Sequence, residues 1–233
     1  MADEFLTTRW SVVLSAAGDD AGAGRALEQL CRDSWRPLFA YARRRGCTQE
    51  DAEDAVQGFL ASLLARKSLA HVSEGRGRFR SFLLSGMRNY LSDAHSRAYA
   101  EKRGGHCAHF SLDVDAAERG YLEVAADSPT PEQAYERAWA MEVMARARAA
   151  LEEECIAGGK GDVFHALFGA DGAGDMQARA EAAARLGLAE TGFRTLAMRL
   201  RRRWRDLIRA ELAQTVTTKS GLDEEMAALR AAL

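Results

Sequence analysis

The sequence contains little proline, with three in 233 residues. Because proline interrupts helices, its scarcity, together with many Ala, Leu, Arg and Glu residues, predicts an all-α fold. The sequence also lacks an apolar run of about 18 residues, the length that a membrane-spanning helix needs. The first ten residues, MADEFLTTRW, lack the basic start and apolar core of a secretory signal. We therefore expect no membrane insertion and a cytoplasmic location.

Cysteine-based and catalytic motifs are missing as well. The four cysteines, Cys31, Cys47, Cys107 and Cys155, have no CxxC spacing, which favours reduced thiols over a disulfide framework. His106, Cys107 and His109 are too close together to ligate one ion easily, and no second ligand group follows at a zinc spacing. There is no Ser/His/Asp order, no carboxylate pair in an apolar setting and no phosphate-binding glycine loop. These absences argue against an enzyme, a metal site and a cofactor.

The segment from Gly77 to Gly105 is the most informative part of the chain. Its buried-face residues are Phe79, Phe82, Leu83, Gly86, Met87, Tyr90 and Leu91. This spacing of three and four residues predicts an amphipathic helix with one buried face. The opposite face carries Arg, Asn, Asp and Ser, and residues 76–103 contain seven Lys or Arg residues against two acidic ones.

Such a face suits a polyanion whose bases are also contacted. Arg neutralises phosphate, while Asn and Asp can hydrogen-bond base edges. The candidate nucleic-acid-binding residues of this segment are Arg78, Arg80, Arg88, Asn89, Asp93, Arg97, Lys102 and Arg103. A merely solvated helix face is the alternative explanation of the same pattern.

A second informative helix is predicted to begin at Thr48. The Thr48-x-x-Asp51 spacing is that of a capping box, and an acidic first turn suits the helix dipole. The buried stripe consists of Ala52, Ala55, Val56, Phe59, Leu60, Leu63 and Leu64, and the opposite side carries Glu50, Glu53, Asp54 and Gln57. That side is a candidate protein-binding surface, although capping alone would explain the acids equally well. We interpret Gly58 as a bare spot at which another protein's backbone could come close.

The segment before Thr48 is expected to be helical. Residues 5–17 favour a short helix and residues 18–24 a loop. A second helix begins at Arg25, and Pro37 is expected to end or kink it near Trp35.

Residues 113–136 contain seven acidic residues and one arginine, and residues 127–131 carry turn signals. This composition predicts an acidic linker between two domains. Thr130-Pro131-Glu132-Gln133 is then expected to cap a helix that ends near Cys155, before a loop-rich stretch at 158–174.

The last part of the chain has the pattern of a helix-turn-helix. Residues 180–186 favour a short helix, 187–189 a glycine turn, and Glu190 begins a long helix with Phe193 and Trp204 on its buried side. Residues 194–209 contain seven arginines against one aspartate. The candidate DNA-binding residues are Glu190, Thr191, Arg194, Thr195, Met198, Arg199 and Arg202. A solvated arginine-rich helix is the alternative. The tail from Gly221 favours a short amphipathic helix without recognisable chemistry.

Taken together, these segments resemble a bacterial RNA polymerase sigma factor of the small extracytoplasmic-function (ECF) kind. AEDAVQGFLASLL at 52–64 looks like the family's polymerase-binding helix, and GRFRSFLLSGMRNYLSD at 77–93 looks like the segment that opens and recognises the −10 element. AEAAARLGLAETGFRTLAMRLRRRWRDL at 180–207 is similar to the helix-turn-helix for the −35 element. The motifs TRWSVVL, LCRDSWRPLFAYARRRG, KRGG, SLD and AQTV also resemble a subgroup known from planctomycetes and related phyla.

The resemblance implies two small helical domains and a role without catalysis. Residues 1–105 would bind core polymerase and the −10 element, 106–130 would be the acidic linker, 131–215 would bind the −35 element, and 216–233 would be a tail. The implied partners are core RNA polymerase, through its β′ clamp helices and β flap, promoter DNA, and an anti-sigma factor. By the family match, Glu50, Glu53, Asp54 and Gln57 would contact polymerase, and Asn89 and Asp93 fall on the family's Asn-x-x-x-Asp spacing.

Two positions depart from the family's pattern. Ala189 stands where the family usually has a capping Ser or Thr, and Gly192 adds a helix penalty, so both weaken the expectation of tight −35 recognition. Gly58 replaces a residue that is more often Glu in the family. A free-standing helix-turn-helix regulator that does not act through polymerase is the alternative function.

Overall fold

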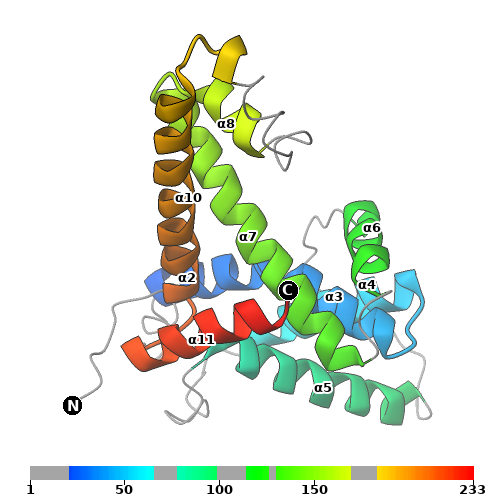
Figure 1. Ribbon diagram of the computed structural model, residues 1–233. Helices are drawn as coiled ribbons and strands as arrows, with labels where there is room; N and C mark the ends of the chain where they lie inside the picture. Colours follow the sequence, from blue (N-terminus) through cyan, green and yellow to red (C-terminus); the bar gives the residue numbers. More distant parts are fainter. Residues whose placement is uncertain (1–20, 66–77, 99–113, 126–129, 169–182) are drawn as a thin grey trace. The chain divides into compact units, whose positions relative to one another are not determined.

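The computed structural model describes residues 21–65, 78–98, 114–125, 130–168 and 183–233, and the regular elements in these ranges are α-helices (Figure 1). The one β-type pairing among them is an isolated antiparallel bridge between Arg78 and Val216. This confirms the predicted all-α fold. None of the helices in these ranges combines the length and the hydropathy needed to cross a membrane. The helix expected at 5–17 and the cluster at 106–109 lie outside the described residues.

The chain divides into two compact units. Unit 1 consists of residues 1–142 and 212–233, and unit 2 consists of residues 143–211. Helices α7 (Pro131–Ala157) and α10 (Glu190–Ala213) each contribute residues to both units. The chain thus returns to unit 1 after α10. The functional domains expected at 1–105 and 131–215 stay predictions.

The first described helices of unit 1 are α2 (Ala21–Arg32) and α3 (Trp35–Arg44), two helices where the sequence analysis expected one helix from Arg25. The break falls at residues 33–34, and Pro37 lies in the first turn of α3. Proline fits there because backbone N–H groups of a first turn have no partner within the helix. The expectation that Pro37 disrupts the helix was therefore right in kind, but the new helix starts before it.

The core of unit 1 is formed around α3, α4 (Gln49–Ala65) and α5 (Phe79–Ala98). The largest fully buried side chains of these helices are Leu38, Phe39, Tyr41, Leu60, Phe79, Leu83 and Met87. On α5 they recur every four residues, so α5 buries one face and leaves the other in solvent, whereas residues 37–42 of α3 are all buried.

The segment expected to be an acidic linker contains α6 (Val114–Ala125), which packs on α3. Arg43 Nε and Nη2 donate to the two carboxylate oxygens of Glu118 at 2.8 and 2.6 Å. The Arg43 guanidinium also lies 5.1 Å from the centroid of the Tyr121 ring. This helix is thus part of unit 1.

Unit 2 contains the second half of α7, α8 (Gly161–Phe168) and most of α10. Val163, Leu167, Ala183, Phe193 and Ala197 form one buried cluster, and Leu151, Cys155 and Phe164 form another, against which Trp204 packs. Phe168 stacks on Phe164 and meets Trp204 edge-on, with ring centroids 5.1 and 5.5 Å apart. These contacts fix which face of α10 is buried.

Candidate nucleic-acid and partner-protein surfaces

Helix α4 presents the acidic face that the sequence predicted. The Asp51 backbone N–H donates to Thr48 Oγ1 at 3.1 Å and the Thr48 hydroxyl donates to the Asp51 carboxylate at 2.8 Å, which confirms the cap. Glu50 and Asp54 are exposed, whereas Glu53 and Gln57 are half-buried. The Gln57 amide donates to Glu53 at 3.0 Å, so these two side chains are held against their own helix. The face thus has an exposed acidic part and a half-buried polar part.

Gly58 is not a bare surface spot, and that interpretation is corrected by the structure. A Cβ at Gly58 would overlap with the Tyr90 hydroxyl of α5. In the reverse direction, a Cβ at Gly86 on α5 would lie 2.9 Å from two ring atoms of Phe59 on α4. The Phe59 and Tyr90 rings are tilted against each other with centroids 5.9 Å apart. Each glycine makes room for the other helix's aromatic ring, so both glycines serve the α4–α5 packing.

Helix α5 exposes three of the predicted nucleic-acid-binding side chains. Arg88, Asn89 and Asp93 are exposed, and the last two lie four residues apart, on one face of the helix. Arg97 belongs to the helix, but its side chain lies outside the described residues, as do Lys102 and Arg103. A compact face of one cation, one amide and one carboxylate remains, which can pair with phosphate and with base edges.

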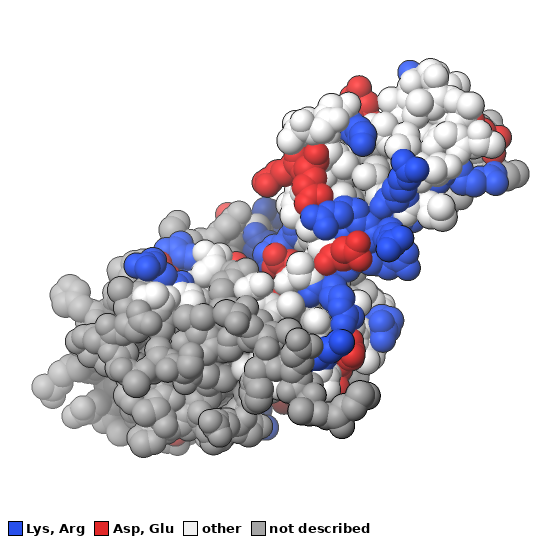
Figure 2. Space-filling model, turned by 90° about the vertical axis from the view of Figure 1, so that its left-hand side faces the viewer, with Lys and Arg blue, Asp and Glu red and all other residues white. Residues whose placement is uncertain are grey.

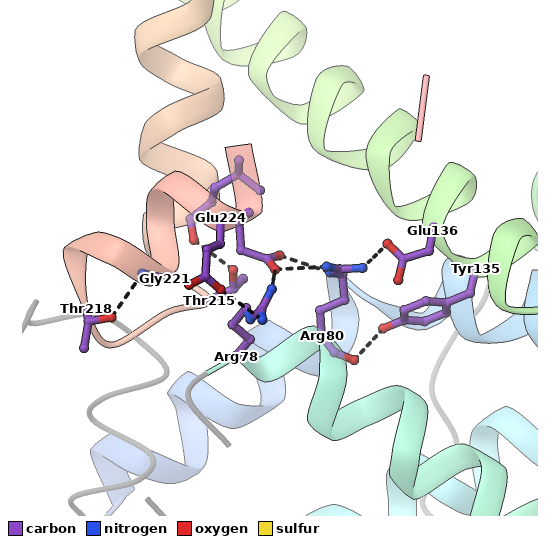
Figure 3. A network of polar contacts seen from close by, with 10 residues as sticks. Arg78, Arg80, Tyr135, Glu136, Thr215, Thr218, Gly221 and Glu224 are labelled. Carbon is purple, nitrogen blue, oxygen red and sulfur yellow. Dashed lines mark hydrogen bonds and ion pairs between the residues drawn. The ribbon is translucent and has the colours of Figure 1, made fainter. Parts of the chain in front are cut away.

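Arg80 does not lie on this exposed face, and its placement there by helical periodicity was wrong. Its side chain is only 8% exposed and pairs with Glu225 of α11 (Lys219–Ala231) and with Glu136 of α7 (Figure 3). Nε and Nη2 of Arg80 donate to the two Glu225 oxygens at 3.0 Å each. Burial by itself lowers the pKa of Arg80, but the hydrogen bond and the charge of Glu225 outweigh it and raise the pKa above its usual value. The guanidinium is committed to protein carboxylates.

Arg78 is half-buried, and its guanidinium contacts two carboxylates of α11. Its Nη2 lies 3.0 Å from the exposed Glu224 carboxylate, and its Nη1 donates to Glu225 at 3.3 Å. Arg78 therefore retains only part of the phosphate-binding capacity that its position in the sequence suggested.

Glu225 was missed by the sequence analysis, although a signal was present. Leu222, Glu225 and Leu229 follow the i, i+3, i+7 spacing of a buried face, and all three are buried. A carboxylate in such a register must have a buried partner, because an unpaired buried charge is costly. The sequence could have indicated a buried ion pair in the tail, but not which arginine completes it.

Helix α10 carries the predicted basic face. Gly187, in the preceding turn, has φ +63°, a conformation that favours glycine, and this confirms the predicted turn. Exposed residues along α10 include Glu190, Thr191, Arg194, Thr195, Met198, Arg199, Arg201, Arg202, Arg205 and Arg209. All seven predicted positions are thus in solvent, and Figure 2 shows basic side chains gathered into a band on this side of the molecule.

Arg194 and Arg203 of this face pair with acidic side chains. Arg194 pairs with Glu190 one turn earlier at 3.1 Å, and both are exposed, so this pair can open to a ligand. Arg203 makes a two-pronged contact with Glu154 of α7, at 2.8 and 2.6 Å. The hydrogen bond from Arg203 lowers the pKa of Glu154 below its usual value. Met198, 65% exposed, is the one large apolar side chain exposed among the described residues of α10.

Comparison with known proteins gives one family. The family model described as ECF sigma factor matches residues 14–156. Comparisons with curated proteins and with solved structures gave no match. The match includes α2 to α7 and both polar faces of unit 1, and it ends before α10 and the C-terminal helix α11.

Proposed function

The chain belongs to the ECF sigma factor family, and on that premise we propose that α4 binds core RNA polymerase while α5 and α10 bind the two promoter elements. Members of this family act in transcription initiation and are not enzymes. The family also implies core polymerase, promoter DNA and an anti-sigma factor as partners. Because core polymerase is a cytoplasmic enzyme, the proposal keeps the predicted cytoplasmic site of action.

The proposed polymerase surface is the solvent face of α4. Glu50 and Asp54 supply two exposed carboxylates, and the hydrogen bond to Glu53 fixes the orientation of the Gln57 amide beside them. Such a face complements a basic groove or helix pair on a partner protein, where opposite charge speeds association. Gly58 is excluded from this surface because it accommodates Tyr90.

The proposed −10 surface is the exposed face of α5 around Asn89 and Asp93. An amide offers a donor and an acceptor to an extruded base, and a carboxylate accepts from one. Arg88 lies beside them and is exposed, so it can neutralise the phosphate of the same strand. Arg80 is removed from this set because its charge is satisfied inside the protein.

The proposed −35 surface is the amino-terminal half of α10. Thr191, Arg194 and Met198 lie on its exposed side and follow the turn at Gly187, as in a recognition helix that enters a major groove. Arg199 and Arg202 would hold phosphate, and Met198 offers an apolar contact for a thymine methyl group.

One observation carries the proposal: unit 1 presents two chemically different polar faces on a directly packed helix pair. α4 and α5 pack directly through Gly58, Phe59, Gly86 and Tyr90. An acidic face and an Arg/Asn/Asp face on one packed pair suit a protein that holds an enzyme and a DNA strand at the same time. A repressor would need only the basic surfaces.

Run-off transcription with purified core polymerase on genomic fragments tests this function. We expect Asp54→Arg with Gln57→Ala to abolish binding to core polymerase and run-off product, while helicity and melting temperature stay close to wild type. Asp115→Arg, a charge reversal at an exposed site on α6, is the control and should bind normally. Retention of core binding by the double variant would contradict the polymerase assignment. Tight promoter binding without core polymerase, and no stimulation of run-off, would favour the free-standing regulator.

A further inference from the structure

The C-terminal segment of the chain is joined to the first turn of α5. Thr215 C=O accepts from the Phe79 N–H at 2.9 Å, and Val216, fully buried, forms the bridge with Arg78. Phe79 is the first residue of α5, so its N–H has no acceptor within the helix. A backbone carbonyl from residue 215 thus performs the task of a helix cap for α5.

The same segment provides a buried carboxylate. Glu225 is 0% exposed and receives two hydrogen bonds from Arg80 and one from Arg78 (Figure 3). The helix that carries it is capped by Thr218, whose side chain accepts from the Gly221 N–H at 3.1 Å. A buried ion pair adds little net stability by itself. The best-supported role of such a pair is to select one packing of the helices over alternative packings.

Arg80 is also held from α7. Its Nη1 pairs with Glu136, its guanidinium lies 4.3 Å from the centroid of the Trp139 ring, and its backbone C=O accepts from the Tyr135 hydroxyl at 3.0 Å. The start of α5 therefore lies in a socket made by two helices, and only the α11 side of that socket comes from beyond the family match.

We propose that residues 214–231 are a positioning element for the strand-binding helix α5, and that Glu225 is the residue through which they act. This inference rests on the proposed function of Asn89 and Asp93. A helix is stiff over the nine residues between Arg80 and Asn89, so a tilt or rotation of its first turn moves the Asn89/Asp93 face as well. Glu225 contacts no DNA in this account, because it is buried beneath the arginines that it orients.

Transcription on two templates tests the proposal with the full chain. One template is a closed promoter duplex, and the other is already mismatched at the −10 bases. We expect Glu225→Gln to lower initiation on the duplex about tenfold, which corresponds to about 1.4 kcal/mol of barrier. On the mismatched template and in core binding we expect it to stay near wild type. Glu224→Gln is the matched control, because Glu224 is 59% exposed and contacts only the outer nitrogen of Arg78.

Hydrogen exchange at the amides of Phe79–Leu83 provides a readout that transcription cannot. Loss of the Glu225 contact should speed exchange there in the Gln variant but not in the Glu224→Gln control. Should Glu225→Gln fail to fold, Glu225→Asp keeps the charge on a shorter arm and should show a smaller duplex-specific loss.

Three results would overturn the inference. The first is equal activity of Glu225→Gln and wild type on both templates, and the second is a loss on both templates that parallels a loss of core binding, which would mean stability alone. The third is increased transcription, which would mean that the tail restrains the protein. If Asn89→Ala with Asp93→Ala selectively impairs the duplex template while Glu225→Gln does not, only the inference fails. If that double variant behaves as wild type, the proposed strand-binding face fails too.

Discussion

Replacement of Gly86 by alanine tests how α4 and α5 fit together. The new Cβ would lie 2.9 Å from Cε2 and Cζ of Phe59, closer than side-chain carbons approach in well-packed proteins. Phe59 cannot easily yield, because its ring is 5% exposed and lies against Tyr90. The α4–α5 pair must therefore separate or force Phe59 out of its rotamer.

The expected magnitude follows from two opposing contributions. Overpacking of a filled core typically costs about 1–3 kcal/mol. Alanine in a helix interior is about 1 kcal/mol better than glycine, which offsets part of that cost. Gly86→Ala should therefore lower the free energy of unfolding of unit 1 by up to about 2 kcal/mol. Gly120→Ala on α6 is the control, because nothing lies within 4 Å of its Cβ, and it should stabilise by about 1 kcal/mol.

Urea unfolding measures the free energy of unfolding of both variants. Hydrogen exchange at the amides of α4 and α5 shows whether the change lies in unit 1. The difference between the two variants cancels the helix preference and isolates the overpacking, about 1–3 kcal/mol. If Gly86→Ala were stabilised as much as Gly120→Ala, the close approach of the two helices would be wrong. The view that Gly58 and Gly86 serve packing would then fail with it.

Two further predictions concern the proposed −10 surface and the ion pair between Glu154 and Arg203. Asn89→Ala with Asp93→Ala should leave core binding intact, lower initiation on a closed duplex, and be partly rescued by a template mismatched at the −10 bases; wild-type activity on the duplex would exclude this face from strand capture. Glu154 contributes stability through Arg203 at pH values above its usual pKa of 4.5, and this contribution is lost as the pH falls through its lower folded pKa. The melting temperature of Glu154→Gln should therefore be below that of the wild type near neutral pH and approach it under acid conditions. Glu153→Gln is the control. A difference in melting temperature that persists in acid would contradict the ion pair.

Several features could be predicted from the sequence because they are local. The cap at Thr48, the cap at Thr130 and the turn at Gly187 depend on contacts within three or four residues. The Thr130 box is complete, since Gln133 N–H donates to Thr130 Oγ1 at 3.2 Å and the Thr130 N–H donates back to the Gln133 side chain at 3.1 Å. The buried faces of α4, α5 and α10 likewise follow from spacing along one helix.

The features that sequence reasoning missed depend on partners that are distant along the chain. Periodicity placed Arg80 on a polar face, but a carboxylate 145 positions later removes it from solvent. Gly58 looked like a bare surface spot, yet its neighbour is Tyr90 on the next helix. Residues 114–125 had the composition of a linker, and Glu118 ties them to Arg43 on α3.

The sequence by itself thus determined the long helices α4, α5 and α10, their buried faces and the caps at Thr48 and Thr130, because a helix needs only its own residues to satisfy its backbone and to sort apolar from polar side chains. The tertiary structure alone decided which charged groups remain available to a partner. A guanidinium is drawn from water only where a second helix brings a carboxylate within hydrogen-bonding distance, as Glu225 does for Arg80, and no pattern along α5 records the approach of α11.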